Sequence, residues 1–343
     1  MTLPTFKTIF SGRLEFGSER TFLKVISMWE HRVLNFYKND VLLKAEEVLD
    51  EETFTLTIPR TIVQTSEKSW RNTISLLEYC SQFAIAGSVS AWMVDSGKML
   101  KHELVEPSSD KVAVQSFLQG RHLVSEKGKE NEAYEALSKA IEKFSRHALA
   151  YERRGYINFQ LGNTKDALYD FTKSIDINPA HPDAYMGRAI VYVEEEKFEE
   201  ARADLEMAVK TSIPHQPVYW QARRMKGECH LELKEFDKAL FDLKLVNQRK
   251  FNDSDPNFKW QSRAAFNFGR ALLAKGNYEE AIEAFTRSAN FEANENILAE
   301  SEPILMRGIA MQKAGKPGYL KEFQKAADKG SRRAASLLAG TQV

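Results

Sequence analysis

Residues 151–179, YERRGYINFQLGNTKDALYDFTKSIDINP, decide the fold of this chain. The small residues Gly155 and Ala167 allow two helices to approach closely, and Phe171 fills the space beside them. Pro179 follows the second helix and stops it. One pair of helices has too little core to be stable alone, so this stretch predicts similar neighbours along the chain.

Such neighbours are present. In the unit 182–209, Ala189 takes the place of Gly155, and the interval between these two positions is 34 (189 minus 155). Weaker copies are centred on Gly120, Gly227, Gly269 and Gly308. A repeating interval of this size is typical of stacked helical repeats.

These positions resemble the tetratricopeptide repeat (TPR) family, whose period is about 34 residues. The resemblance runs from near Val112 to the end of the chain. It implies an all-α superhelix of about five to six helix-turn-helix repeats, with a concave face lined by the first helix of each pair. The last helix, expected at Ser331–Leu338, would cap the stack.

Two insertions break the period. The interval from Ala189 to Gly227 is 38 (227 minus 189), and the surplus lies in 214–220. The interval from Gly227 to Gly269 is 42 (269 minus 227), with the surplus in 250–260. Trp220 and Trp260 stand beside these insertions. We expect them to pack the inserted segments, and contact with a partner is the alternative.

The amino-terminal third has mixed periodicity, with segments in the order β-α-β-α-β-β. It predicts a small α+β domain in which two helices cover one face of a sheet. The predicted strands are Thr8–Phe16, Thr53–Ile58 (ending at Pro59), Ala84–Val94 and Met99–Val105; the predicted helices are Glu19–Tyr37 and a helix N-capped by Ser66 that runs to Gln82. Asp95-Ser96-Gly97 is a hairpin turn candidate. No family is recognised in this part.

We therefore expect three segments: the α+β domain over 1–106, a linker over 107–111 beginning with Pro107, and the TPR array over 112–343. The domain boundary rests on the change from mixed to purely helical periodicity.

Charge and cysteine content limit the function. The chain has 48 Lys and Arg against 48 Asp and Glu, which gives no overall attraction to nucleic acid or anionic membrane. Its two cysteines, Cys80 and Cys229, suggest no disulfide framework. The segment MTLPTFKTIF lacks a signal-peptide pattern, and no apolar run suits a membrane span. We expect a cytoplasmic protein without membrane insertion.

No pattern in the sequence predicts catalysis. His31 has charged neighbours, but consecutive helical residues point in different directions. The glycines do not form a phosphate-binding loop, and no cysteine–histidine cluster has metal-ligand spacing. We therefore predict no catalytic residues, no metal and no cofactor, and a protein that is not an enzyme.

The repeat register predicts which side chains face the concave surface. The candidate protein-binding residues are Arg121, Glu152, Arg153, Tyr156, Phe159, Met186, Ile190, Glu194, Arg224, Glu228, Phe266, Asn267 and Arg270. They mix apolar groups with charges of both signs. Such a surface suits a peptide or helix better than nucleic acid, which favours a continuous basic track. Packing between adjacent repeats is the competing interpretation of each position.

The favoured function is a non-catalytic adaptor or scaffold for protein–protein interaction. Its repeats would bind a peptide or helix segment, and residues 1–106 would add a second contact, localisation or a homo-oligomer interface. One alternative is an enzymatic or signalling amino-terminal domain regulated by peptide binding to the repeats, which predicts a polar, pocketed sheet. Another is a structural subunit of a large assembly that docks through the insertions.

Overall fold

The computed structural model describes residues 4–292 and 294–340. It divides into two compact units, which are described separately. Unit 1 runs to Val191 and unit 2 begins at Tyr192, so the division falls inside one helix. Unit 1 contains a sheet with its helices and the first helical repeats, and unit 2 contains the remaining repeats.

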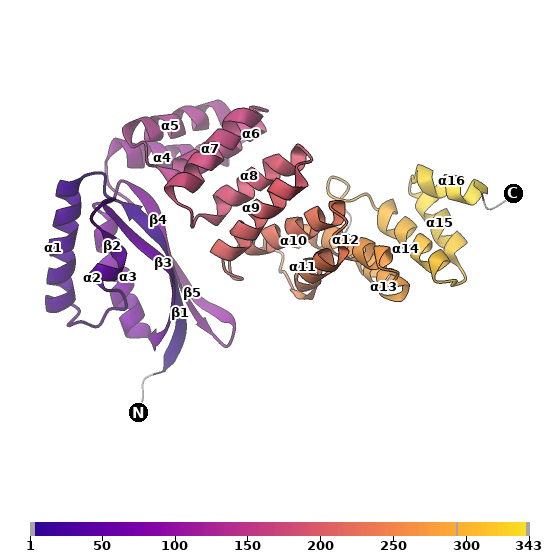
Figure 1. The fold of residues 1–343 in the computed structure, drawn as a ribbon, viewed down its shortest axis with the longest axis horizontal. Coiled ribbons are helices and arrows are strands. Elements are labelled where there is room, and N and C mark those ends of the chain that lie inside the picture. The colour runs from indigo at the N-terminus through magenta and orange to yellow at the C-terminus, as the bar shows by residue number, and fades with distance from the viewer. Residues whose placement is uncertain (1–3, 293, 341–343) are drawn as a thin grey trace. The chain divides into compact units, whose positions relative to one another are not determined.

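Unit 1 begins with a five-stranded antiparallel sheet in the order β2-β3-β1-β4-β5. The strands are β1 Thr5–Glu15, β2 Leu49–Asp50, β3 Thr55–Ser66, β4 Ala86–Asp95 and β5 Lys98–Val105. The helices α1 Glu19–Asn35, α2 Ala45–Val48 and α3 Glu67–Ser81 lie on one side of it (Figure 1). Phe10, Phe22, Trp29, Trp70 and Leu77 form the core between these layers.

The predicted α+β architecture is confirmed, and its two helices cover one face of the sheet. The sequence did not predict the short elements α2 and β2. The expected end of a strand at Pro59 is wrong, because β3 continues to Ser66. The pairing of β1 with β3 shifts at this point, so that both Pro59 and Arg60 lie opposite Ser11. A proline is tolerated in such a bulge because no ladder hydrogen bond is required from its nitrogen.

Local sequence explains two of the junctions. The Ser66 hydroxyl accepts a hydrogen bond from the backbone N–H of Ser69 and caps α3, as predicted. Ser96 and Gly97 connect β4 to β5 with φ of 47° and 79°. Positive φ at both central residues is the requirement of a tight hairpin turn whose twist matches the strands.

The face of the sheet opposite its helices combines apolar side chains with polar ones such as Lys7 and Gln64, which pair on β1 and β3. Ile9 and Trp92 pair across β1 and β4, and Trp92 stacks on His102 of β5 with 5.2 Å between ring centroids. On the same face Ile62, Met99 and Leu104 are about half exposed, at 53%, 49% and 50%. Exposed apolar side chains gathered on one sheet face are typical of an interaction surface.

Beyond the sheet the described chain is helical. The helices are α4 Val112–Val124, α5 Glu130–Lys143, α6 Ala148–Gln160, α7 Thr164–Ile177, α8 Pro182–Glu194, α9 Phe198–Thr211, α10 Pro217–Glu232, α11 Phe236–Gln248, the 3-10 turn η1 Phe258–Trp260, α12 Gln261–Ala274, α13 Tyr278–Ala289, α14 Ser301–Lys313, α15 Tyr319–Asp328 and α16 Arg332–Gly340. The succession of helix pairs and the final helix confirm the predicted repeat fold.

Close packing between helices explains the small residues of the repeat. A Cβ placed on Gly155 of α6 would lie 2.9 Å from the Phe171 ring, and one on Gly187 of α8 would lie 2.2 Å from the same ring. Both distances are shorter than side chains normally tolerate. Phe171, fully buried, therefore occupies space that only glycine leaves on the two first helices.

The turns between the helices of each pair show the same period. From the second pair onward, each turn has a residue with positive φ, at Gly162, Glu196, Lys234, Gly276 and Gly315. The intervals are 34 (196 minus 162), 38 (234 minus 196), 42 (276 minus 234) and 39 (315 minus 276). They equal the intervals between the small residues of the first helices, so the insertions lie between repeats and leave each helix pair intact.

Candidate functional site

The candidate residues all lie on first helices of the helix pairs. Unit 1 contains Arg121 on α4, Glu152, Arg153, Tyr156 and Phe159 on α6, and Met186 and Ile190 on α8. Unit 2 contains Glu194 at the end of α8, Arg224 and Glu228 on α10, and Phe266, Asn267 and Arg270 on α12. Their contact with a partner stays a prediction, but their surroundings separate them into two groups.

Glu152 is the most deeply buried candidate in unit 1. Its side chain is fully buried, and neither carboxylate oxygen has a hydrogen-bond partner among the described residues. Arg153 Nε lies 3.1 Å and His181 Nε2 lies 3.8 Å from its Oε2. Burial opposes protonation of His181, but the adjacent Glu152 carboxylate prevails and raises the pKa of that imidazole. Glu152, Arg153 and His181 therefore form a group of charged side chains in unit 1.

Aromatic packing fills the neighbouring surface of unit 1. The Tyr156 ring meets Phe171 edge to face at 5.0 Å, and its hydroxyl donates to the backbone oxygen of Asp183 at 3.3 Å. Burial raises the pKa of Tyr156 well above its ordinary value. Met186 is buried, and Phe159 packs against the same cluster. These side chains serve the packing between repeats, which was the competing interpretation.

The remaining candidates of unit 1 are more accessible. Arg121 forms an ion pair of 2.6 Å with Glu106, and its guanidinium lies 5.6 Å from the Phe117 ring centroid. Ile190 is partly buried on α8. Arg121 therefore joins the helical array to the segment after β5, inside unit 1.

Unit 2 contains a groove of about 340 Å³ on its first helices. We call it the unit 2 groove. It is lined by the end of α8, the turn that follows, the start of α9, and the helices α10 and α12. Its polar lining includes Glu194, Glu196, Glu228, Glu232, Asn267 and Arg270, and its apolar lining includes Val193, Phe198 and Met225. Four of the predicted candidates, Glu194, Glu228, Asn267 and Arg270, therefore lie together in one cavity.

The centre of the groove is an ordered polar network around Glu228. Its carboxylate accepts from Arg224 Nη1 at 2.7 Å and from Asn267 Nδ2 at 3.1 Å, and Arg263 Nε lies 3.3 Å away. Arg270 donates to Asn267 Oδ1 at 3.2 Å and to Glu232 Oε1 at 3.2 Å. Because Arg224 is almost fully buried, the network fixes α10 against α12 and holds the groove open.

Phe266 lies outside this network. It packs against Phe285 with ring centroids 5.8 Å apart, in the core between α12 and α13. Its position on the repeat register is concave, but its ring serves packing. Phe266 and Tyr156 thus have comparable roles in the two units.

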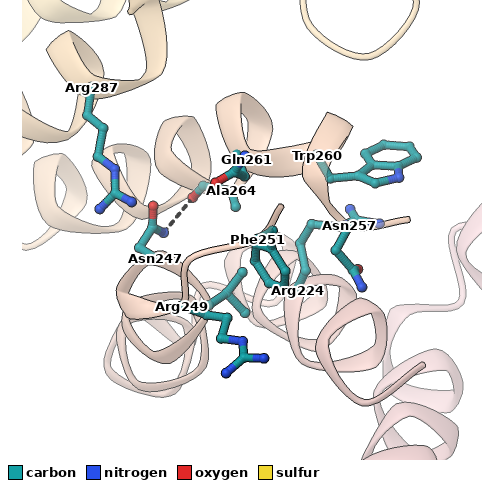
Figure 2. Close-up of a pocket in the computed structure, with 10 residues that line it drawn as sticks. Arg224, Asn247, Arg249, Phe251, Asn257, Trp260, Gln261, Ala264 and Arg287 are labelled. Carbon is teal, nitrogen blue, oxygen red and sulfur yellow. Dashed lines mark hydrogen bonds between the residues drawn. The ribbon is translucent and has the colours of Figure 1, made fainter. Parts of the chain in front are cut away.

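The second insertion packs on its own repeat. Phe251 is buried with Val246 and Ala264, and Trp220 packs edge to face on it at 6.0 Å. The centroid of the Trp260 ring lies 4.2 Å from Cζ of the Arg224 guanidinium. Figure 2 shows side chains of α10, α11 and α12 gathered around Phe251. The hollow that remains is about 10 Å³, enough for one water molecule, so packing of the inserted segment is the role that the structure displays.

The first insertion has a different outcome. α10 begins at Pro217, inside the inserted segment, and is 16 residues long, compared with 13 for α6 and α8. Proline favours the first helical position because its missing N–H is not needed there. Trp220 Nε1 donates to the backbone oxygen of Pro214 at 2.8 Å, which ties the preceding turn to the lengthened helix.

The candidates do not include seven residues that line the groove. Four of these, Val193, Met225, Glu232 and Arg263, lie on first helices, and the other three are Glu196, Phe198 and Cys229. Glu196 and Phe198 belong to a turn and to a second helix, which the concave register does not include. A signal was nevertheless present, because Glu196 stands one repeat interval, 34 (196 minus 162), after Gly162 and takes the place of that glycine. Cys229 lies beside Glu228 on α10, and burial raises its pKa to about 12, so it has the character of a core thiol.

The described residues hold neither a metal-binding cluster nor a membrane-spanning helix. No group of three or more His, Cys, Asp or Glu among residues 4–292 and 294–340 has an arrangement that could hold a metal ion. In the same ranges, no helix combines the length and apolar character needed to cross a membrane.

Comparison with family models identifies the helical part of the chain. Residues 126–182 and 186–243 match one tetratricopeptide repeat model, and residues 262–294 match another. The amino-terminal region has no family match. The matched models describe repeats and no catalytic family, in agreement with the predicted TPR resemblance.

Curated proteins are similar to part of the chain. RNA polymerase II-associated protein 3 of Rattus norvegicus is 25% identical over 192 residues, which cover 45% of this chain and 29% of that protein. The chain spans less than a third of the length of the curated relatives it matches.

Solved structures show the same fold. YrrB, described as a TPR protein with an unusual peptide-binding site, has a TM-score of 0.51 and 21% identity, covering 61% of this chain and 100% of that one. Pseudomonas aeruginosa PilF has a TM-score of 0.52 and 15% identity, covering 67% and 98%. At these identities the likeness concerns the fold alone.

Proposed function

Because the chain carries tetratricopeptide repeats, we propose that it is a non-catalytic interaction adaptor that binds a peptide or helical segment of a partner protein. The observation that supports this proposal is the unit 2 groove, an open cavity formed by first helices of successive repeats. The groove combines apolar contacts with fixed hydrogen-bonding groups. This combination suits recognition of a short segment, since apolar side chains supply binding energy and polar groups supply orientation.

We also propose that residues 1–106 act as a separate contact module and that 107–111 connect it to the array. The exposed Ile62, Met99 and Leu104 on the outer face of the sheet support this role. Sedimentation of the full chain and of Leu104→Lys tests whether this face forms a homo-oligomer; self-association that Leu104→Lys leaves unchanged would argue against it.

The adaptor function can be tested with a random twelve-residue peptide library displayed on phage and selected on the full chain. We expect enrichment of peptides that bind in the groove. Met225→Trp should reduce their affinity at least tenfold, because the indole would occupy the apolar part of the groove.

Met207 supplies a matched control. It has the same residue type and is also partly buried, but it lines a different cavity, on α9. Met207→Trp should leave peptide affinity unchanged. Failure to select any peptide, or equal effects of the two substitutions, would contradict binding in the groove.

A further inference from the structure

The residues that line the unit 2 groove indicate which kind of peptide segment would bind there. This inference rests on the proposed function. We propose that the groove selects a segment with a lysine or arginine beside an apolar residue. The cation would lie between Glu194 and Glu196, and its aliphatic stem would cover the adjacent apolar surface.

The charged side chains that line the groove favour a cationic partner over an acidic one. Four glutamates and two arginines line it. Glu228 is matched by Arg224 and Arg263, and Glu232 is matched by Arg270, so the lining arginines are already engaged. An acidic segment would meet no unmatched cation among the lining residues that the structure describes.

Glu194 and Glu196 differ from the other two glutamates. Both are exposed, and no ion pair or side-chain hydrogen bond joins either of them to another described residue. Adjacent Glu195 instead pairs with Lys197 at 2.8 Å. Two unmatched carboxylates at one end of a groove create a local negative potential that favours a cationic group.

Apolar neighbours make the site fit a long cationic side chain. Val193 and Phe198 line the groove on either side of the turn that carries Glu196, and Met225 lines it from α10. Lysine and arginine bury their methylene stems on such surfaces while their charged ends stay in a polar environment. A phosphate polymer lacks that stem and would be repelled by the same carboxylates.

The test begins with the sequences recovered from the phage library. Lysine or arginine next to leucine, methionine or an aromatic residue should be enriched. One recovered peptide is then labelled with fluorescein as the probe for fluorescence anisotropy on the full chain. We expect replacement of its cation by norleucine to weaken binding about tenfold, and binding to weaken as salt rises from about 0.1 to about 0.5 M.

Variants of the chain test whether the carboxylates of Glu194 and Glu196 attract the cation of the peptide. Glu194→Gln with Glu196→Gln should weaken the probe about tenfold. The matched control is Glu199→Gln with Glu200→Gln, which removes two exposed carboxylates from the first turn of α9, outside the groove, and should change affinity less than twofold. Thermal melting of each variant checks that folding is retained.

A second pair of variants separates charge from backbone effects. Glu196 and Lys234 occupy equivalent turns with φ of 56° and 59°, but Lys234 is not part of the groove lining. Glu196→Gly should weaken the probe about threefold, and Lys234→Gly should not. Equal effects would show that turn flexibility, and not the carboxylate, controls binding.

The outcomes distinguish this inference from the proposed function. Peptides that are blocked by Met225→Trp but show no cationic preference, or are acidic, would overturn the inference and leave the adaptor function standing. The absence of any peptide binding would overturn both. Binding that depends on Glu194 and Glu196 but not on Glu199 and Glu200 would support both.

Discussion

The helices α6 in unit 1 and α10 in unit 2 occupy the same place in the repeat but build different surfaces. Where α6 has Glu152, a buried acid without hydrogen-bond partners in the described chain, α10 has Arg224, a buried base bonded to Glu228. Where α6 has Tyr156, packed on Phe171, α10 has Glu228 itself. One surface is filled with aromatic rings, and the other has a polar network around an open groove. The repeat register therefore positions side chains without deciding whether they pack or bind.

Removing the aromatic core of unit 1 should have the largest effect. Phe171→Ala would leave an unfilled space between Gly155, Gly187 and Tyr156, at a cost of about 4 kcal/mol in the free energy of unfolding. The equivalent Phe285→Ala in unit 2 should cost about 3 kcal/mol, since Phe285 contacts one such glycine, Gly269. Urea denaturation followed by circular dichroism measures both.

Hydrogen exchange read by mass spectrometry assigns each loss to its unit, because a repeat array need not unfold in one step. Tyr169→Ala is the control, since that side chain is 55% exposed. It should cost less than about 0.5 kcal/mol. A Phe171→Ala variant as stable as Tyr169→Ala would show that the shared glycine contacts do not hold unit 1 together.

The buried charges should give the second largest difference. Arg224→Met would leave Glu228 with Arg263 and Asn267 but without its shortest bond, at a cost of about 2 kcal/mol. Glu152→Gln at pH 8.5 should cost less, about 1 kcal/mol, because the carboxylate accepts no hydrogen bond that the amide would lose and the Arg153 side chain of its ion pair is 41% exposed. Chemical denaturation of both variants checks the contrast.

A matched substitution keeps the charge in unit 2. Arg224→Lys retains a cation near Glu228 but cannot reproduce the stacking of the guanidinium on Trp260, so its stability should lie between those of Arg224→Met and the parent chain. Equal losses for Glu152→Gln and Arg224→Met would mean that the two buried charges are equivalent in spite of their different partners.

Two buried histidines should make the stability of unit 1 and that of unit 2 depend differently on pH. His147 in unit 1 caps α6 through Nδ1, which accepts from the Ala150 N–H at 3.2 Å, and burial lowers its pKa to about 3. A neutral folded histidine with a lowered pKa stabilises fully above its unfolded pKa, and stability falls as pH decreases below about 6.5. Between pH 7 and pH 5 the loss should be about 2 kcal/mol.

His230 in unit 2 is the comparison. Burial lowers its pKa, but the hydrogen bond to Glu235, 2.6 Å from Nδ1, opposes that effect. His147→Asn keeps a capping group that does not titrate and should remove most of the acid sensitivity of unit 1. His230→Asn should remove much less from unit 2. Denaturation midpoints from pH 5 to pH 8 test this, and similar slopes for both variants would contradict it.

The contrast between α6 and α10 also shows how much of the structure can be predicted from the sequence. The spacing of Gly155, Ala167 and Phe171 was sufficient for the repeat fold, because close helix packing requires small residues at fixed positions. It was not sufficient for the groove. Whether Glu228 faces solvent or joins a network depends on Arg263 and Asn267 of the next repeat, and an insertion whose path the register does not describe lies between them.

The sheet of unit 1 gives a second case. Alternation predicted its strands, but the strand end expected at Pro59 is wrong, since proline interrupts only a regular ladder. The structure places it in a bulge opposite Ser11, and no local pattern in the single strand reveals the extra residue. Register shifts depend on the partner strand, so reasoning about one segment misses them.

The smallest expected effect concerns the turns, where unit 1 has Gly162 at φ 79° and unit 2 has Glu196 at φ 56°. Glu196→Gly should stabilise the chain by about 0.5 kcal/mol, since relief of left-handed strain exceeds the larger entropy that glycine loses on folding. Gly162→Glu should cost about 1 kcal/mol. Lys234→Gly is the control for Glu196→Gly and should give the same gain, measured as the shift of the urea midpoint.

These small changes in stability help to explain why one turn has glycine at position 162 and the other has glutamate at position 196. If Glu196→Gly gains stability but loses affinity for the peptide probe, the carboxylate is retained at the groove at the expense of stability, as binding residues often are. If it gains stability and binds unchanged, the residue has no part in recognition, and the charge of the groove must act through Glu194 alone. The stability of Glu196→Gly and its affinity together therefore decide whether the groove differs from the filled surface of unit 1 in function as well as in shape.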